Sequence, residues 1–345
     1  MTSRTLALIA VVLLLAGLTT YLLLADDSND ADALKTTKAT ADRIFKVEDI
    51  DRIGRVFIAD RQGNTSDLRL DPATGKWTFQ DKYDANPNSI KNLLDAVTRI
   101  EMDYQPNNKA VPKLVQDLAT EGIKVEVYDR NDELINAYYI GGPTMDERGT
   151  YGIREGYDQP YVINIPGWTG NVRYRFNLTG DDWRQKKFTD RDISEITAFS
   201  LDYPKQRDKS FRAERRSDGR WLVQPFYEST AQTARTVAAG EAEGYLAPLE
   251  KLYINRYLND RTELLEEDRE LIPFAILNFK WKDGRNDELK FYPRLQNIFM
   301  QDRKSGKQEI VGNKDGYGAF INDGQDYVLF GETMIEPFFV SIDRF

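Results

Sequence analysis

Neither cysteine nor histidine occurs in the 345 residues of this chain. The absence of cysteine excludes disulfides and thiolate nucleophiles, and the absence of histidine excludes Ser-His-Asp triads and the commonest zinc and iron sites. The chemistry that remains belongs to carboxylates, lysine, tyrosine, serine and threonine. We therefore expect no metal and no cofactor, and we expect any domain outside the membrane to be stabilised by core burial alone.

Clustered positive charge is also scarce. The net charge is −9. The best basic stretch, Arg184 to Lys187, is too short to follow a phosphate backbone. Nucleic acid is therefore not an expected partner.

The N-terminus carries one long run without charge, from Leu6 to Ala25. As a helix this run spans about 30 Å, the thickness of the hydrocarbon core of a bilayer. A cleavable signal peptide needs a shorter apolar region, of about 7–15 residues, and small residues before the cut. The pattern favours an uncleaved anchor (residues 1–25) over a removed signal, with the lipid bilayer contacted by residues 6–25.

A polar segment, residues 26–43, follows the apolar run and lacks aromatic residues and any apolar period. This composition is typical of a flexible tether. Arg4 precedes the run and several aspartates follow it, so the positive-inside bias places the rest of the chain outside the cytoplasm. We expect a single-pass protein of a bacterial inner membrane with a periplasmic C-terminal domain.

The pattern predicts that folded sequence begins near Ile44 and consists of two repeats, a first over 44–190 and a second over 191–345. Gly75-Lys76-Trp77 recurs as Gly219-Arg220-Trp221. Further along the chain, two dipeptides recur with the same separation in sequence. Tyr151-Gly152 recurs as Tyr317-Gly318, and Tyr161-Val162 recurs as Tyr327-Val328. A tandem duplication accounts for both observations, and the alternative is that two β-rich domains share Gly-x-Trp and Tyr-Gly by chance. Extra strand-like sequence at 298–300 and 309–311 accounts for the greater length of the second copy.

Each repeat has the same order of predicted elements. Alternating strands precede the tryptophan, a helix follows it, and a hairpin comes next. The first helix begins at Pro87 and carries apolar residues at i, i+3, i+4 and i+7, whereas the second, over 233–252, is weaker because Gly240 and Gly244 interrupt it. The fold class is therefore α+β, with two tandem antiparallel sheets and one main packed helix on each.

This order of elements resembles the bacterial domain-of-unknown-function 4340 family. The similarity rests on the Gly-x-Trp turn, on the N-terminal span, and on four motifs: Ile140-Gly141, Tyr151-Gly-Ile-Arg154, Pro160-Tyr-Val-Ile163 and Asp181-Asp182-Trp183-Arg184 with the following Lys187 to Arg191. It covers 44–221 well and the second copy more loosely. The resemblance implies a membrane-anchored, extracytoplasmic companion of ABC transporters of the gliding-motility type, and it brings no catalytic residues.

The aromatic residues divide into two groups of candidates. Trp77 and Trp221 each lie on a predicted strand and are expected to be core residues that pack their own helix. Tyr151, Arg154, Trp168 and Trp183 form a candidate surface for a partner, a peptide or a glycan, because amphipathic rings and arginine are common in binding hot spots. Packing at a strand edge is the alternative for this second group.

Carboxylates offer the remaining candidates. Asp181-Asp182 or Glu266-Glu267-Asp268 would serve a glycosidase only if two carboxyl groups faced each other across a cleft about 5–10 Å wide. Sequence neighbours on a turn or a helix seldom do so. Asn313-Lys-Asp-Gly316 has the polar alternation of a calcium loop but lacks its first and last ligands.

Two functions therefore stand as hypotheses. The first is a scaffold or binding module that is not an enzyme and that contacts an ABC-type permease or another envelope protein. The second is an envelope hydrolase that uses two carboxylates on a glycan. Two buried carboxylates brought together in a cleft with a raised pKa would favour the second.

The topology is testable with protease added to spheroplasts. We expect digestion of the domain that begins near Ile44, because the charge asymmetry and the length of the apolar run agree. Protection of the domain would reverse the orientation, and recovery of a mature form that starts near Asp26 would show a secreted protein.

Overall fold

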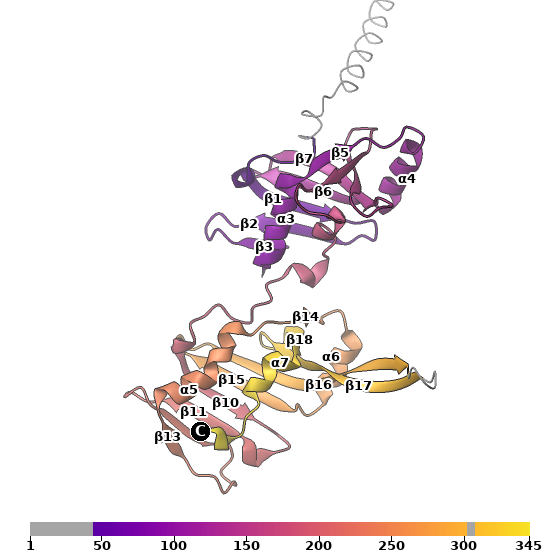
Figure 1. Cartoon of the computed structure of the whole chain (residues 1–345). Coiled ribbons are helices and arrows are strands. Elements are labelled where there is room, and N and C mark those ends of the chain that lie inside the picture. Colours follow the sequence, from indigo (N-terminus) through magenta and orange to yellow (C-terminus); the bar gives the residue numbers. More distant parts are fainter. Residues whose placement is uncertain (1–43, 302–307) are drawn as a thin grey trace, which may run out of the picture. The chain divides into compact units, whose positions relative to one another are not determined.

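The computed structural model describes residues 44–301 and 308–345, which form two units (Figure 1). The division falls between Trp183 and Arg184, whereas the sequence pattern placed it after residue 190. The predicted anchor (1–25) and the predicted tether (26–43) lie outside the described residues. Within those residues no helix is long and apolar enough to cross a membrane.

The first unit is a nine-stranded antiparallel sheet in the order β4-β3-β2-β1-β6-β7-β8-β9-β5. Two helices accompany it, α3 (Pro87–Arg99) and α4 (Val111–Glu121). Its strands are β1 (Ile53–Ala59), β2 (Thr65–Leu70), β3 (Trp77–Phe79), β4 (Tyr83–Asp84), β5 (Glu101–Tyr104), β6 (Ile123–Asp129), β7 (Leu134–Pro143), β8 (Thr150–Arg154) and β9 (Tyr161–Asn164).

The second unit repeats this arrangement in the order β13-β12-β11-β10-β15-β16-β17-β18-β14. Its helices are α5 (Ala239–Leu246), α6 (Thr262–Glu270) and α7 (Glu332–Ile335). Its strands are β10 (Ile196–Asp202), β11 (Phe211–Arg215), β12 (Trp221–Pro225), β13 (Arg235–Val237), β14 (Arg256–Tyr257), β15 (Ala275–Trp281), β16 (Asn286–Gln301), β17 (Gln308–Ile321) and β18 (Asp326–Gly331).

The two strand orders match position by position, which confirms the α+β class with two antiparallel sheets. Trp77 and Trp221 occupy equivalent places, since each begins the third strand of its unit and pairs with the last residue of the second strand, Leu70 or Arg215. Trp221 is buried in the second core, as expected. Trp77 is only partly buried and packs at the margin of the first core.

The main core of the first unit lies between α3 and one face of the sheet. The side chain of Asn86 caps α3 by accepting the backbone N–H of Asn88, and Pro87 supplies the first helical residue. The apolar stripe of α3 then packs on alternate residues of the central strands, such as Val56 and Val127. In the second unit α5 is shorter than expected and continues as a 3-10 turn (Ala247–Lys251).

A second helix in each unit was not anticipated, so the expectation of one main helix per sheet is incomplete. α4 contacts β7 and β8, and a Cβ on Gly141 would lie 2.8 Å from Cδ2 of Leu118. In the second unit Leu264 and Leu265 of α6 pack on a separate cluster that includes Phe320. These helices cover only one end of the sheet face opposite the main core.

The recurring Tyr-Gly dipeptides are one residue out of register. The strand pairing from β1 through β6 and β7 to β8 corresponds to the pairing from β10 through β15 and β16 to β17. This correspondence makes Gly152 equivalent to Ala319, and Tyr151 equivalent to Gly318. Accordingly Tyr317 is buried in the main core, whereas Tyr151 lies on the opposite face. The shared strand order, not this dipeptide, supports the duplication.

The extra sequence of the second copy lies in its longest hairpin. β16 and β17 pair as far as Gln301 and Gln308, and the expected strand segments at 298–300 and 309–311 fall within them. Neighbouring strands pair with only one part of this hairpin. β15 pairs with β16 no further along than Phe291, and β18 pairs with β17 only from Gly316 onward.

The different burial of the two tryptophans predicts different costs of truncation. Trp221 is 1% exposed and its ring centroid lies 5.2 Å from that of Phe199. We expect Trp221→Ala to lower the unfolding free energy of the second unit by about 3–5 kcal/mol, and Trp77→Ala to cost the first unit less. Urea unfolding of the full chain followed by circular dichroism measures both, and equal losses would contradict the assignment.

Candidate functional site

The outer face of the first sheet, meaning the face opposite α3, carries an ordered set of charged side chains. Strand alternation turns Arg55 of β1 outward between the core residues of that strand. Cross-strand pairing places Arg69 of β2 on one side of it and Tyr128 of β6 on the other. The same pairing sets Asp67 and Glu126 on either side of Phe57.

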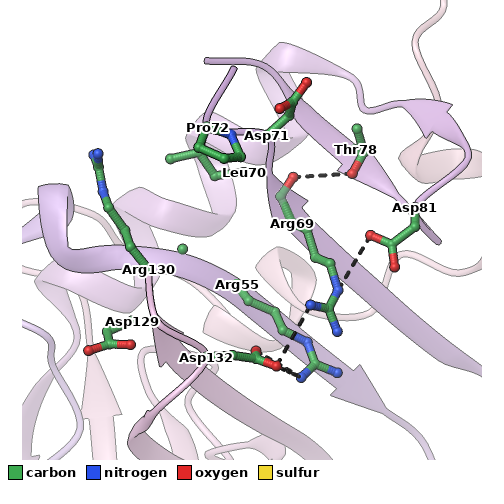
Figure 2. Close-up of a pocket in the computed structure, with 11 residues that line it drawn as sticks. Arg55, Arg69, Leu70, Asp71, Pro72, Thr78, Asp81, Asp129, Arg130 and Asp132 are labelled. Atoms are coloured by element: carbon green, nitrogen blue, oxygen red, sulfur yellow. Dashed lines mark hydrogen bonds and ion pairs between the residues drawn. The ribbon is translucent and has the colours of Figure 1, made fainter. Parts of the chain in front are cut away.

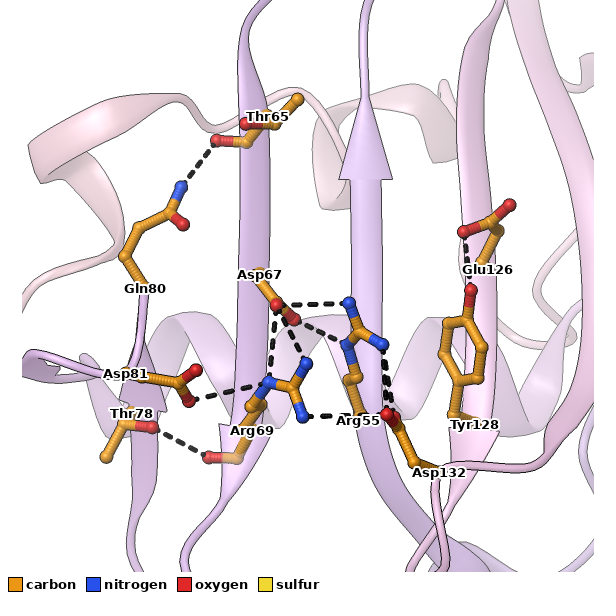
Figure 3. A network of polar contacts seen from close by, with 10 residues as sticks. All are labelled: Arg55, Thr65, Asp67, Arg69, Thr78, Gln80, Asp81, Glu126, Tyr128 and Asp132. Atoms are coloured by element: carbon orange, nitrogen blue, oxygen red, sulfur yellow. Dashed lines mark hydrogen bonds and ion pairs between the residues drawn. The ribbon is translucent and has the colours of Figure 1, made fainter.

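Arg55 is the centre of this set, as Figure 3 shows. Its Nε and Nη2 donate to the two carboxylate oxygens of Asp67 at 2.7 and 3.1 Å, and its Nη1 donates to Asp132 at 3.1 Å. The hydrogen bond to Asp67 contributes most to raising the pKa of Arg55. With both side chains less than 20% exposed, at 19% and 17%, this bidentate pair is partly shielded from water and holds a fixed geometry.

Arg69 shares the same carboxylates. Its Nε and Nη2 each lie 3.2 Å from Oδ2 of Asp67. Carboxylate oxygens of Asp81 and Asp132 lie 3.4 Å from its Nε and 3.8 Å from its Nη1, respectively. Two guanidinium groups are thus held among three carboxylates. We call these five residues, Arg55, Asp67, Arg69, Asp81 and Asp132, the arginine–aspartate belt.

A second polar group continues the belt across β6. Tyr128 donates from its hydroxyl to Glu126 at 2.7 Å, and Nζ of Lys124 lies 2.7 Å from Glu126 and 3.0 Å from Glu155. Partial burial raises the pKa of Glu126, but the hydrogen bonds from Lys124 and Tyr128 outweigh it, so the pKa is lowered. The guanidinium of Arg55 lies 4.7 Å from the centroid of Tyr128, which joins the two groups.

A pocket of about 520 Å³ opens beside the belt, between the β2–β3 turn and the β6–β7 turn (Figure 2). Asp71 at its rim accepts a hydrogen bond from the hydroxyl of Thr74 and another from the backbone N–H of Ala73, and Asp129 accepts the backbone N–H groups of Glu133 and Asn131. These turn hydrogen bonds lower the pKa of both carboxyls. Arg130 donates from Nε to the carbonyl of Asp51 at 2.6 Å. The pocket offers ionised, hydrogen-bonded groups that suit polar recognition. A raised carboxyl pKa favours proton transfer near neutral pH, whereas the pKa values of Asp71 and Asp129 are lowered.

The second unit does not repeat the belt. Its strand register puts Ala198 in the place of Arg55, Arg212 in the place of Asp67, and Glu214 in the place of Arg69. The central arginine is therefore absent from the equivalent strand, and the signs of the two flanking charges are exchanged. The belt is a feature of the first copy, not of the common framework.

The candidate surface residues from the sequence are dispersed. Trp183 is 0% exposed and donates from its indole N–H to the carbonyl of Leu178 at 2.9 Å, so it is a core residue of the first unit and does not lie on a surface. Tyr151 and Arg154 point to opposite faces of β8 by strand alternation. Trp168 packs at the margin of the first core, with the guanidinium of Arg175 5.2 Å from its ring.

The candidate carboxylates are also separated. Asp181 and Asp182 lie in the 3-10 turn Gly180–Trp183 of the first unit. Glu266, Glu267 and Asp268 lie on α6 of the second, where the two glutamates are exposed and Asp268 is buried. The segment 313–316 lies on β17, in which Asp315 pairs with Arg256 at 3.0 Å. Among the described residues no group of three acidic side chains is placed to hold a metal.

Sequence reasoning missed the belt because its residues come from two strands and two turns. A signal was present, since β1, β2 and β6 each alternate charged or aromatic residues with buried aliphatic ones. The pairing of opposite charges depends on the register between strands that are distant in the chain. That register cannot be read from a single strand.

The family follows from a comparison with known families. The model of the family described as "Domain of unknown function (DUF4340)" matches residues 77–269, more than half of the chain. The chain belongs to this family. The match runs from β3 of the first unit to α6 of the second, so it includes the junction between the units. No curated protein matches the chain.

The lowered pKa of Glu126 predicts a pH dependence of stability. A carboxyl whose folded pKa lies below its usual value of 4.5 stabilises the fold above that pH, and this contribution is lost as the pH falls through the folded pKa. We expect Glu126→Gln to reduce the loss of first-unit stability on acidification below about pH 4.5. Urea unfolding at a series of pH values measures it. Glu133→Gln, in the exposed β6–β7 turn, is the control, and an unchanged acid limb in Glu126→Gln would contradict the prediction.

Proposed function

We propose that the chain is a binding module without enzymatic activity, anchored in the bacterial inner membrane by residues 6–25, and that the outer face of its first unit contacts a protein partner. The apolar run and the polar segment after it support the anchor and a periplasmic position for the folded units. In this proposal the partner is an ABC-type permease or its periplasmic subunits, or another component of a gliding-type envelope complex.

One observation carries the proposal, namely the restriction of the arginine–aspartate belt to the first copy. The second unit reaches the same strand order with Ala198, Arg212 and Glu214 at the equivalent positions, so the common fold does not require the belt. Residues that folding does not require, but that are held in a defined geometry, are typical of a recognition surface. Arginine and tyrosine are also the residues that contribute most often to the binding energy of interfaces.

The belt has the properties of a surface prepared for binding. Its charged groups pair with one another before any partner arrives, so little side-chain entropy is lost on association. Tyr139 and Tyr128 add aromatic area beside it, with the guanidinium of Arg61 5.4 Å from the centroid of Tyr139. The charges also oppose wrong partners, since an unmatched charge would be desolvated without compensation.

Copurification tests this proposal. We expect full-length protein solubilised in detergent to retain an ABC-type permease or its periplasmic subunits, and Arg69→Ala to reduce the retained amount about tenfold, as loss of a hot spot does. Glu214→Ala, at the equivalent position of the second unit, is the matched control and should retain the partner. Circular dichroism verifies the fold of each variant.

Further variants separate the alternatives. Tyr151→Ala, Arg154→Ala and Trp168→Ala, made singly, test whether the closing hairpin of the first unit shares the surface. Normal retention in Arg69→Ala would show that the belt is not the contact. Loss of a measurable hydrolytic activity in Asp181→Asn or Asp182→Asn would replace the binding module with the carboxylate hydrolase.

A further inference from the structure

The second unit contains a larger pocket on its own outer face, the face opposite its main core. This pocket has a volume of about 650 Å³ and opens between the end of α6 and the β17–β18 turn. Ile276, Tyr292 and Phe320 line it from the strands, Arg269 and Leu271 from the end of α6, and Asp323 from the turn. This volume is typical of pockets that bind small ligands or single side chains with their flanking groups.

The lining combines an apolar floor with an apolar wall that is open to solvent. Tyr292 and Phe320 are nearly buried, at 5% and 7% exposed. Leu271 on the wall and the adjacent Ile272 are 51% and 58% exposed. Neighbouring apolar side chains left in contact with water gain free energy when a ligand covers them.

One cation at the rim, the guanidinium of Arg269, is available to bind a ligand. The guanidinium of Arg269 lies 5.6 Å from the ring centroid of Phe320, and it makes no hydrogen bond or ion pair with any residue that the structure describes. Lys290 differs, because its Nζ pairs with Glu288 at 3.1 Å. A carboxylate matches the paired N–H donors of a guanidinium.

Two buried polar clusters hold α6 and the β17–β18 turn in place on the two sides of the pocket. One cluster contains Tyr327 of β18, and the other contains the preceding residue, Asp326. Asp268 of α6 is 0% exposed, and one of its carboxylate oxygens accepts hydrogen bonds from Arg294 and from the hydroxyl of Tyr327. This contact fixes the end of α6, where Arg269 is the next residue.

The turn is fixed in a similar way. Asn322 donates to Asp326 at 2.8 Å, and Asp326 forms a bidentate pair with buried Arg184, with both N–O distances 2.8 Å. The pocket is therefore formed before any ligand arrives, which lowers the cost of binding.

The first unit has no equivalent arrangement. Only Gly122 separates α4 from β6, whereas four residues, 271–274, separate α6 from β15. The strand register sets Gly141 at the place of Tyr292, and Lys124 at the place of Ile276. The wall and the floor of the pocket are thus additions of the second copy, and the fold common to the two units does not require them.

We propose that this pocket binds the C-terminal end of a partner polypeptide whose last side chain is large and apolar. The side chain covers Phe320, Tyr292 and Leu271, and the terminal carboxylate accepts hydrogen bonds from Arg269. The polar rim formed by Glu288, Lys290 and Asp323 meets the peptide amides that precede the last residue, which favours a peptide over a simple fatty acid.

The test uses full-length protein in nanodiscs, so that no detergent competes for the pocket. The probe is a fluorescein-labelled peptide, Gly-Ser-Gly-Ser-Gly-Phe, with either a free C-terminal carboxylate or a C-terminal amide, and fluorescence anisotropy reports binding. We expect the free acid to bind about tenfold more tightly than the amide, the size of a charge-assisted hydrogen bond. In Arg269→Gln this difference should disappear, and Leu271→Ser should weaken both peptides.

A matched control and two contrary results complete the test. Arg261→Gln removes an exposed arginine just before α6, outside the pocket, and should bind both peptides as the parent does. Equal binding of acid and amide, or no binding of either to the folded parent, would overturn the proposal. Displacement of the peptide by octanoate at an equal concentration would show a site for simple fatty acids instead.

Discussion

A nine-stranded sheet has two faces to cover, and in each unit only one of them is covered along its whole width. The main core lies on that face and contains most of the buried apolar side chains. On the other face a single short helix covers one end, and the remaining strands stay in contact with solvent. Because stability comes chiefly from the covered face, the residues of the opposite face are free to differ between the two units.

A shared β-bulge decides which residues reach the open face. The pairing of the central strands shifts between Ile53 and Arg55 in the first unit and between Ile196 and Ala198 in the second. One inserted residue changes the face of every residue beyond it. The bulge at this place brings Arg55 outward and Val56 into the core, and the close approach of Gly54 to the β6–β7 turn leaves no room for a side chain there. The two copies keep this bulge but carry different residues after it.

Local patterns predicted the elements that depend on neighbours in the chain. The cap and apolar stripe of α3, the Gly-x-Trp turns and the alternating strands all gave the correct type of structure, and the similarity of the two halves predicted the shared strand order. The patterns failed where register decides the outcome. The Tyr-Gly match lay one residue out of register, and the contacts of Arg55 with Asp67 and Asp132 join separate strands and turns. Trp183 was assigned to a surface because sequence alone does not show that its turn folds back onto a core.

The junction of the two units has a practical meaning for fragments of this chain. Trp183 is buried in the first unit, while the next residue, Arg184, is buried in the second by its ion pair with Asp326 and by the ring of Tyr257, 4.0 Å from its guanidinium. A cut at the peptide bond between them would put a new carboxylate beside one core and a new ammonium beside a buried cation. Fragments of the two units should therefore overlap in sequence, with the first extended beyond Arg184 and the second begun before Trp183. Each fragment keeps the native structure at its end only if it contains both Trp183 and Arg184.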